Sequence, residues 1–193
     1  MFNTYLEKNL NVLPKNKQTD VKNIREQNRF VSFQDRPSTS HIPIDSFLLS
    51  QGVKDCLTWR GIALGKSVYD LALIPRKIWE NRPATILEIG SGEGASAIWM
   101  ADLCKSYGLS TRVYSMEIKS PDIQYANVTF IQGNSEKIDT MFDVINLHHP
   151  WRIVEDANIK VNKIMEYHEN HMDVADYMII EESRRKMQTT VEV

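Results

Sequence analysis

Three glycines alternate with other residues directly after an apolar run, in the order Glu88-x-Gly90-x-Gly92-x-Gly94. Glycine lets the backbone turn sharply and lets a ligand approach closely, and a helix that starts there presents unpaired N–H groups. A dinucleotide-binding turn has the spacing Gly-x-Gly-x-x-Gly, which this segment lacks. An acid just before the glycines suits a ligand with a cationic ammonium group, because it would repel a pyrophosphate. The residues predicted to contact such a ligand are Glu88, Gly90, Ser91, Gly92, Gly94 and Ser96.

Two polar residues accompany the next two predicted strands, 112–118 and 128–133. Glu117 lies near the carboxyl end of the first strand, where a carboxylate can accept hydrogen bonds from both hydroxyls of a ribose. Asn134 directly follows the second strand and can contact an adenine edge. The alternating glycines and the two acids together resemble the S-adenosylmethionine (SAM) site of class I methyltransferases. The alternative is a purely structural turn with a solvated Glu117.

Two acidic pairs end two further candidate strands: Glu155 with Asp156, and Glu181 with Glu182. If these strands are neighbours, the carboxylates converge and repel one another unless a cation joins them. Oxygen ligands favour a hard ion such as Mg²⁺ or Ca²⁺, which can hold a substrate hydroxyl and orient its oxygen toward a methyl donor. His149, expected beside these acids, is a candidate general base. The alternatives are acids that simply end strands and a histidine that belongs to a loop.

Strands separated by helices or long connections indicate parallel β-α-β units with right-handed crossovers. The expected strands are 85–90, 112–118, 128–133 and 177–182, and the expected helices include 96–107 and 159–172. Either 142–147 or 151–156 can supply the fourth strand, and the apolar pattern does not decide between them. This order predicts an α/β, Rossmann-like, mostly parallel sheet with helices on both faces. A polar segment over 1–45, read as a lid or a frayed terminus, precedes the SAM-binding domain over 46–193.

Residues 59–183 resemble the cephalosporin hydroxylase and rhamnosyl O-methyltransferase family, a branch of class I methyltransferases. The motifs that carry the resemblance are Trp59-Arg60-Gly61 and the segments 86–90, 94–99, 149–158 and 176–183. The resemblance implies that the fourth strand runs from Ile153 to Asp156. It also implies that Asp156, Glu181 and Glu182 hold Mg²⁺, with Asp156 acting in catalysis. Two departures are Asn158, where the family usually has His, and Glu182, where it usually has Asp.

The resemblance implies a SAM-dependent, Mg²⁺-assisted O-methyltransferase that acts on a hydroxyl of a small molecule, either a secondary metabolite or a sugar. The sheet of class I methyltransferases usually continues with a helix and an antiparallel pair of strands, for which the residues after Ser183 are too few. We therefore expect a shortened sheet whose last strand is covered in a homo-oligomer, because an open edge invites association. The first alternative is a non-catalytic, methyltransferase-like binding or assembly subunit. The second, a dinucleotide-dependent oxidoreductase, is disfavoured by the glycine spacing.

The overall composition narrows the classes of partner. The chain has 193 residues, a formal net charge of -2 and 42% hydrophobic residues, which fits one globular domain. A near-neutral charge offers no general attraction for nucleic acid, and no apolar run is long enough to span a membrane. Cys56 and Cys104 are isolated, as expected of reduced thiols in a cytoplasmic protein.

Overall fold

The computed structural model describes residues 45, 50, 56–140, 146–157 and 161–181, with the backbone alone at 138–140. These residues belong to one compact unit, Ile44–Val193. The predicted segment 1–45 lies outside the described residues apart from Asp45, and so does most of the alternative fourth strand over 142–147. Among the helices that the structure describes, none is long and apolar enough to cross a membrane.

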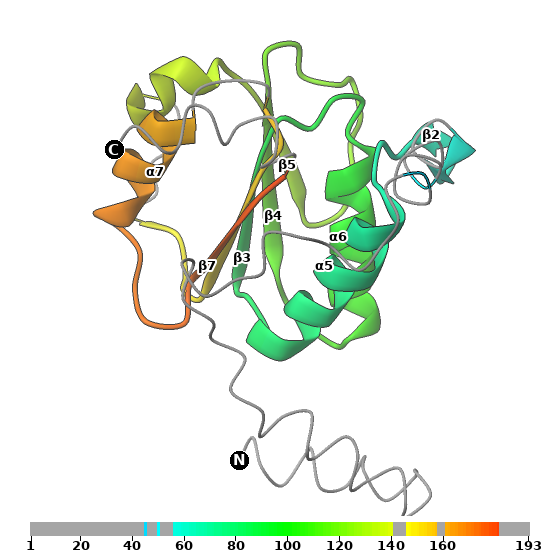
Figure 1. Cartoon of the computed structure of the whole chain (residues 1–193), viewed down its shortest axis with the longest axis horizontal. Helices are drawn as coiled ribbons and strands as arrows, with labels where there is room; N and C mark the ends of the chain where they lie inside the picture. Colours follow the sequence, from blue (N-terminus) through cyan, green and yellow to red (C-terminus); the bar gives the residue numbers. More distant parts are fainter. Residues whose placement is uncertain (1–44, 46–49, 51–55, 141–145, 158–160, 182–193) are drawn as a thin grey trace, which may run out of the picture. The chain divides into compact units, whose positions relative to one another are not determined.

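The centre of this unit is a five-stranded sheet in which all neighbouring strands pair in parallel (Figure 1). Its order is β5-β4-β3-β6-β7, and these strands are Val128–Gln132, Arg112–Glu117, Thr85–Ile89, Trp151–Glu155 and Tyr177–Ile180. All five residues of the central strand β3 are buried, as expected of a parallel strand covered on both faces. The predicted α/β, Rossmann-like, mostly parallel sheet is confirmed. The fourth strand, β6, comes from the segment predicted over 151–156.

Helices cover both faces of this sheet (Figure 1). On one face lie α5 (Val68–Asn81) and α6 (Ala95–Ser106). On the other face lie α7 (Val161–Glu169) and the 3-10 segment η2 (Ser135–Thr140). The carboxyl ends of the five parallel strands lie along one edge of the sheet, which is where ligands bind in open α/β sheets.

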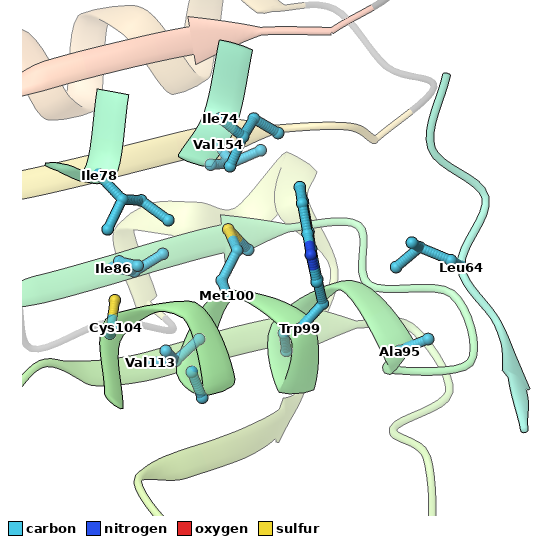
Figure 2. Close-up of a cluster of buried hydrophobic side chains, with 12 residues drawn as sticks. Leu64, Ile74, Ile78, Ile86, Ala95, Trp99, Met100, Cys104, Val113 and Val154 are labelled. Atoms are coloured by element: carbon cyan, nitrogen blue, oxygen red, sulfur yellow. The ribbon is translucent and has the colours of Figure 1, made fainter. Parts of the chain in front are cut away.

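The core consists of two apolar clusters, one on each face of the sheet. Figure 2 shows the first, in which Ile74 of α5 and Met100 of α6 gather with Ile86 of β3. The second joins Leu87 of β3 to Ile164 of α7. Successive strand residues point to opposite faces, which explains why Ile86 and Leu87 belong to different clusters.

A short hairpin precedes the sheet and consists of β1 (Thr58–Trp59) and β2 (Ile62–Ala63). Its two turn residues are Arg60 and Gly61, which have φ angles of 52° and 83°. Two consecutive left-handed residues make the kind of two-residue turn that fits the twist of a β-hairpin, and glycine adopts this conformation without a steric cost. The Trp59-Arg60-Gly61 motif therefore forms this turn.

Asp102 of α6 fastens the hairpin to the domain. Its carboxylate accepts hydrogen bonds from Trp59 Nε1 at 2.8 Å, from Arg60 Nε at 2.8 Å and from the Tyr125 hydroxyl at 2.6 Å. Desolvation raises the pKa of Asp102, but the hydrogen bonds from Arg60, Tyr125 and Trp59 outweigh it and lower this pKa to about 2. Stability that depends on the charged carboxylate is therefore fully present above the unfolded-state pKa of about 4 and is lost as the pH falls through 2.

Asp102→Asn is expected to lower the free energy of unfolding by about 2 kcal/mol at pH 7, because charge-assisted hydrogen bonds are lost. Urea denaturation at pH 7 and at pH 2.5 measures the effect, and the difference between wild type and variant should shrink at the lower pH. Asp122→Asn, at an exposed position, is the matched control and should leave stability unchanged within about 0.5 kcal/mol. An equal loss of stability in the two variants would contradict the assigned role of Asp102.

Candidate functional site

A cavity of about 840 Å³ opens at the carboxyl ends of β3, β4 and β6. Six of the residues predicted to form the site line this cavity: Gly90, Ser91, Gly92, Ser96, Glu117 and Asp156. Several other residues of the wall were not predicted, among them Leu64, Glu93, Met116, Ile118 and Ala157. Ile118 and Ala157 directly follow the predicted site residues Glu117 and Asp156. Their positions at the ends of two predicted strands could therefore have identified them. Leu64 had no such signal, because it comes from the distant hairpin.

Gly90 allows two strand ends to approach each other closely. It has a φ of 92°, and a Cβ atom built on it would lie 2.7 Å from the backbone nitrogen of Ala157 and 2.8 Å from the carbonyl carbon of Asp156. A side chain at this position would therefore push the end of β6 away from the glycine turn. Gly90 brings the turn and Asp156 to one wall.

Glu117 is fixed at the end of β4 by the glycine turn itself. One carboxylate oxygen accepts a hydrogen bond from the Gly92 N–H at 2.8 Å, and the other accepts one from the Ile118 N–H at 2.8 Å. Each oxygen can accept a second hydrogen bond, since a carboxylate has about four acceptor positions. Glu117 is thus a preorganised acceptor on the cavity wall, suited to a pair of hydroxyls.

Glu88 was predicted to contact the ligand, but it does not line the cavity. Its side chain is fully buried, lies behind the cavity wall and accepts a hydrogen bond from the Ser115 hydroxyl at 2.6 Å. Glu88 shares its face of β3 with Ile86, and its Oε1 atom has no hydrogen-bond partner within the described part of the chain. Burial raises the pKa of this carboxyl.

Two further predicted contacts also point elsewhere. The Asn134 side chain accepts a hydrogen bond from the Glu136 N–H at 2.9 Å, so it caps η2, and the wall beside it is formed by neighbouring residues. Gly94 begins α6 and faces Phe130 and Pro121 rather than the cavity. Gly94 shapes the turn through its φ of 88° and does not line the site.

Ser91 provides an unsatisfied polar atom on the wall. The residue is 7% exposed, and its hydroxyl has no hydrogen-bond partner within the described part of the chain. A buried hydroxyl without a partner is costly unless a ligand or water satisfies it. Together with Glu117, this hydroxyl fits a polar ligand that lies along the glycine turn.

The two acids predicted on neighbouring strands do converge. Asp156 Oδ2 and Glu181 Oε1 lie 2.8 Å and 2.6 Å from the same atom, Lys66 Nζ. Glu182 and Asn158 lie outside the described residues. Within those residues, no three His, Cys, Asp or Glu side chains group in a way that would hold a metal ion. The cation on which the two carboxylates meet in this structure is therefore the Lys66 ammonium.

The three charged side chains of this cluster differ in how deeply they are buried. The side chains of Lys66 and Glu181 are 1% and 4% exposed, whereas that of Asp156 is 25% exposed and reaches the cavity. Burial lowers the pKa of Lys66, but the neighbouring carboxyl groups of Glu181 and Asp156 raise it by a larger amount. The net shift of this pKa is therefore upward. Lys66 therefore remains a charged ammonium. Burial and the neighbouring Asp156 raise the pKa of Glu181, the ammonium of Lys66 lowers it, and the net direction is upward.

The prediction that His149 is a base beside the acids is wrong. His149 precedes the first residue of β6, whereas Asp156 follows its last, and five strand residues span about 17 Å. His149 Nδ1 instead lies 2.7 Å from Asp176, and its ring stacks on Trp151 with a centroid distance of 4.0 Å. The histidine belongs to the amino edge of the sheet, opposite the cavity.

The chain is similar to known methyltransferases. The family model described as Rhamnosyl O-methyltransferase/CmcI matches residues 51–184. A rhamnosyl O-methyltransferase of Mycobacterium leprae (strain TN) is 26% identical over 137 residues, which cover 65% of this chain but only 60% of that protein. A solved structure of CmcI with Mg-SAM has a TM-score of 0.62 at 23% identity, over 88% of this chain and 86% of that chain. A structure of CmcI with SAH has a TM-score of 0.58 at 28% identity, over 76% and 78% of the two chains.

Proposed function

Since the chain belongs to the rhamnosyl O-methyltransferase/CmcI family, we propose that it is a SAM-dependent O-methyltransferase that uses Mg²⁺ to methylate a hydroxyl of a small molecule. The observation that carries this proposal is the shared wall of the cavity, on which the glycine turn, Glu117 and Asp156 lie together. The name of the relative, a rhamnosyl O-methyltransferase, favours a sugar hydroxyl as the acceptor.

The residues present fit SAM. Glu117 offers acceptor positions for the two ribose hydroxyls, and the Ser91 hydroxyl needs a partner. Gly92, which also lines the cavity, has open space where a side chain would lie. When bound, SAM supplies a methyl group on a positively charged sulfur. SAM would thus supply the methyl group for the acceptor oxygen and remain as the thioether product, and the acceptor's hydroxyl proton would be released.

The residues present also fit a hard cation in their chemistry. Asp156 and Glu181 point carboxylate oxygens at one place, and Glu182 is a further candidate ligand in this proposal. Carboxylate oxygens are preferred ligands of Mg²⁺. When bound, Mg²⁺ lowers the pKa of a hydroxyl that it contacts. Asp156 has the catalytic role in the proposal, because it is the acid of the pair that reaches the cavity and can orient the acceptor.

Calorimetric titration tests the cofactor half of the proposal. S-adenosylhomocysteine (SAH), the product that remains after methyl transfer, is expected to bind at one site per chain, whereas NAD is expected to show no binding at the same concentrations. Tight binding of NAD without binding of SAH would favour the oxidoreductase alternative. Binding of SAH without any effect of Mg²⁺ or any turnover would favour the non-catalytic subunit.

We also propose that the protein forms a homo-oligomer. In the described part of the sheet, β7 is an edge strand of four residues, and an edge strand offers unpaired backbone groups to a second chain. Multi-angle light scattering at micromolar concentration should give a mass of at least twice 22.3 kDa. A mass equal to that of one chain would contradict this proposal.

A further inference from the structure

Lys66 is a fully enclosed cation that joins three separate parts of the fold. It directly precedes Ser67, the residue that caps α5, and it pairs with Asp156 after β6 and with Glu181 after β7. These partners are 90 and 115 residues away in the sequence. Ser67 and Asp70 form a reciprocal capping box at 2.8 Å and 3.3 Å, which fixes the backbone next to Lys66.

The position of Lys66 coincides with the place where the proposed metal would have to bind. Its Nζ donates to one oxygen of each carboxylate, at 2.8 Å to Asp156 and 2.6 Å to Glu181. The acidic groups near Lys66 are Asp156, Glu181 and, from β3, the buried Glu88. Lys66 is thus one positive charge that faces carboxyl groups from three strands.

We propose that Lys66 is the built-in counter-ion of the Asp156–Glu181 pair and that Mg²⁺ binds this pair in competition with it. This inference rests on the Mg²⁺ site of the proposed function. Before the metal binds, the ammonium holds two carboxylates together that would otherwise repel each other. When the metal binds, its oxygen ligands must come within about 2.1 Å of it, and the nearby ammonium repels it. Lys66 is thus a positioning residue that preorganises the site and weakens its affinity for Mg²⁺.

Removing the charge of Lys66 is expected to lower the melting temperature of the metal-free protein and to raise its affinity for Mg²⁺. Lys66→Met removes the charge, and Lys66→Gln removes it while keeping a hydrogen-bond donor. Without Mg²⁺, both variants should melt at a lower temperature than wild type, because the buried Glu181 and the partly exposed Asp156 lose their partner. With Mg²⁺, both should bind the metal at least about tenfold more tightly than wild type, and their melting temperatures should rise more steeply with MgCl₂. A residue that only supported the fold would not increase the metal affinity when removed.

Titration calorimetry and thermal melts of the full chain with MgCl₂ test this. Lys105→Met is the matched control, because it removes one positive charge at an exposed position near the far end of α6, and it should bind Mg²⁺ as wild type does. Tighter Mg²⁺ binding by both Lys66 variants would support the inference. Equal or weaker binding than in wild type, or binding of Mg²⁺ to none of the proteins, would overturn it.

A second measurement covers the case in which the Lys66 variants do not fold. In the wild-type protein, the NMR signal of the buried Lys66 ammonium, assigned by its absence in Lys66→Arg, should move when MgCl₂ is added. An unchanged signal at saturating Mg²⁺ would overturn the inference. Titration of the wild-type protein with SAH separates this result from the proposed function. If the wild-type protein did not bind SAH, the cofactor proposal would fail, whatever its response to Mg²⁺.

Discussion

Glu117→Ala is expected to weaken the binding of SAH by about thirtyfold, which corresponds to about 2 kcal/mol. The carboxylate lies on the cavity wall, and backbone N–H groups of Gly92 and Ile118 hold it in place at 2.8 Å each. Because these contacts fix the carboxylate before the ligand arrives, the ribose hydroxyls gain charge-assisted hydrogen bonds without the cost of ordering a side chain. Isothermal titration calorimetry measures the loss.

Two further variants separate the ligand contact from other effects of this change. Glu93→Ala removes an acid from an exposed position on the same wall, and it should change the affinity for SAH by less than about threefold. Glu117→Gln keeps one acceptor oxygen and should bind with intermediate affinity. If folded Glu117→Ala bound SAH as tightly as wild type, the assignment of the nucleoside pocket would fail.

Most of the fold could be predicted because most of its strands and helices have a recognisable pattern within a short stretch of sequence. The strand that became β3 is an apolar run that ends at a glycine turn, and α6 follows it directly, so each boundary lay within about one residue of the prediction. The fourth strand could not be chosen from the apolar pattern, because both candidate segments satisfy it. The resemblance chose the segment that contains Ile153 and Asp156, and the pairing of β6 with β3 and β7 agrees with that choice.

The predicted site differs from the structure for two main reasons. The direction of a side chain on a strand was not considered, and residues at opposite ends of one strand were taken to be close together. Glu88 was assigned by its distance from the glycines, but the twofold repeat of a strand places it on the face of the buried Ile86. His149 is seven residues from Asp156, which is short in the sequence but spans a whole strand. Asn134 is used locally, since asparagine readily accepts a hydrogen bond from an N–H two residues later.

Lys66 was missed for a different reason. It lies in a short segment between a hairpin and a helix, and no local pattern distinguishes it from a solvated lysine. Its role depends on partners that only the parallel arrangement of β6 and β7 brings within 2.8 Å. A buried charge whose partners are far apart in the sequence can be recognised only after the strand order is known.

Asp156→Asn is expected to abolish the effects of Mg²⁺ while leaving the cofactor pocket intact. Asparagine has nearly the same shape, so the close approach of Gly90 to the end of β6 is kept. Lys66 retains its ion pair with Glu181, which preserves the packing behind the cavity. SAH should therefore bind within about threefold of its wild-type affinity, because its predicted contacts lie on the glycine turn and Glu117.

Two measurements show whether Asp156→Asn has lost its response to Mg²⁺. A ligand at one hundred times its Kd stabilises a folded protein by about 2.7 kcal/mol, so saturating MgCl₂ should raise the melting temperature of wild type by several degrees. It should not raise that of Asp156→Asn, because one of the two converging carboxylates is gone. Turnover of a hydroxyl acceptor should stop in wild type with EDTA, return with MgCl₂, and remain at least about a hundredfold lower in the variant. If Asp156→Asn were still stabilised by Mg²⁺ and still turned over, the metal would have to bind elsewhere, and the Asp156–Glu181 pair would have Lys66 as its permanent partner.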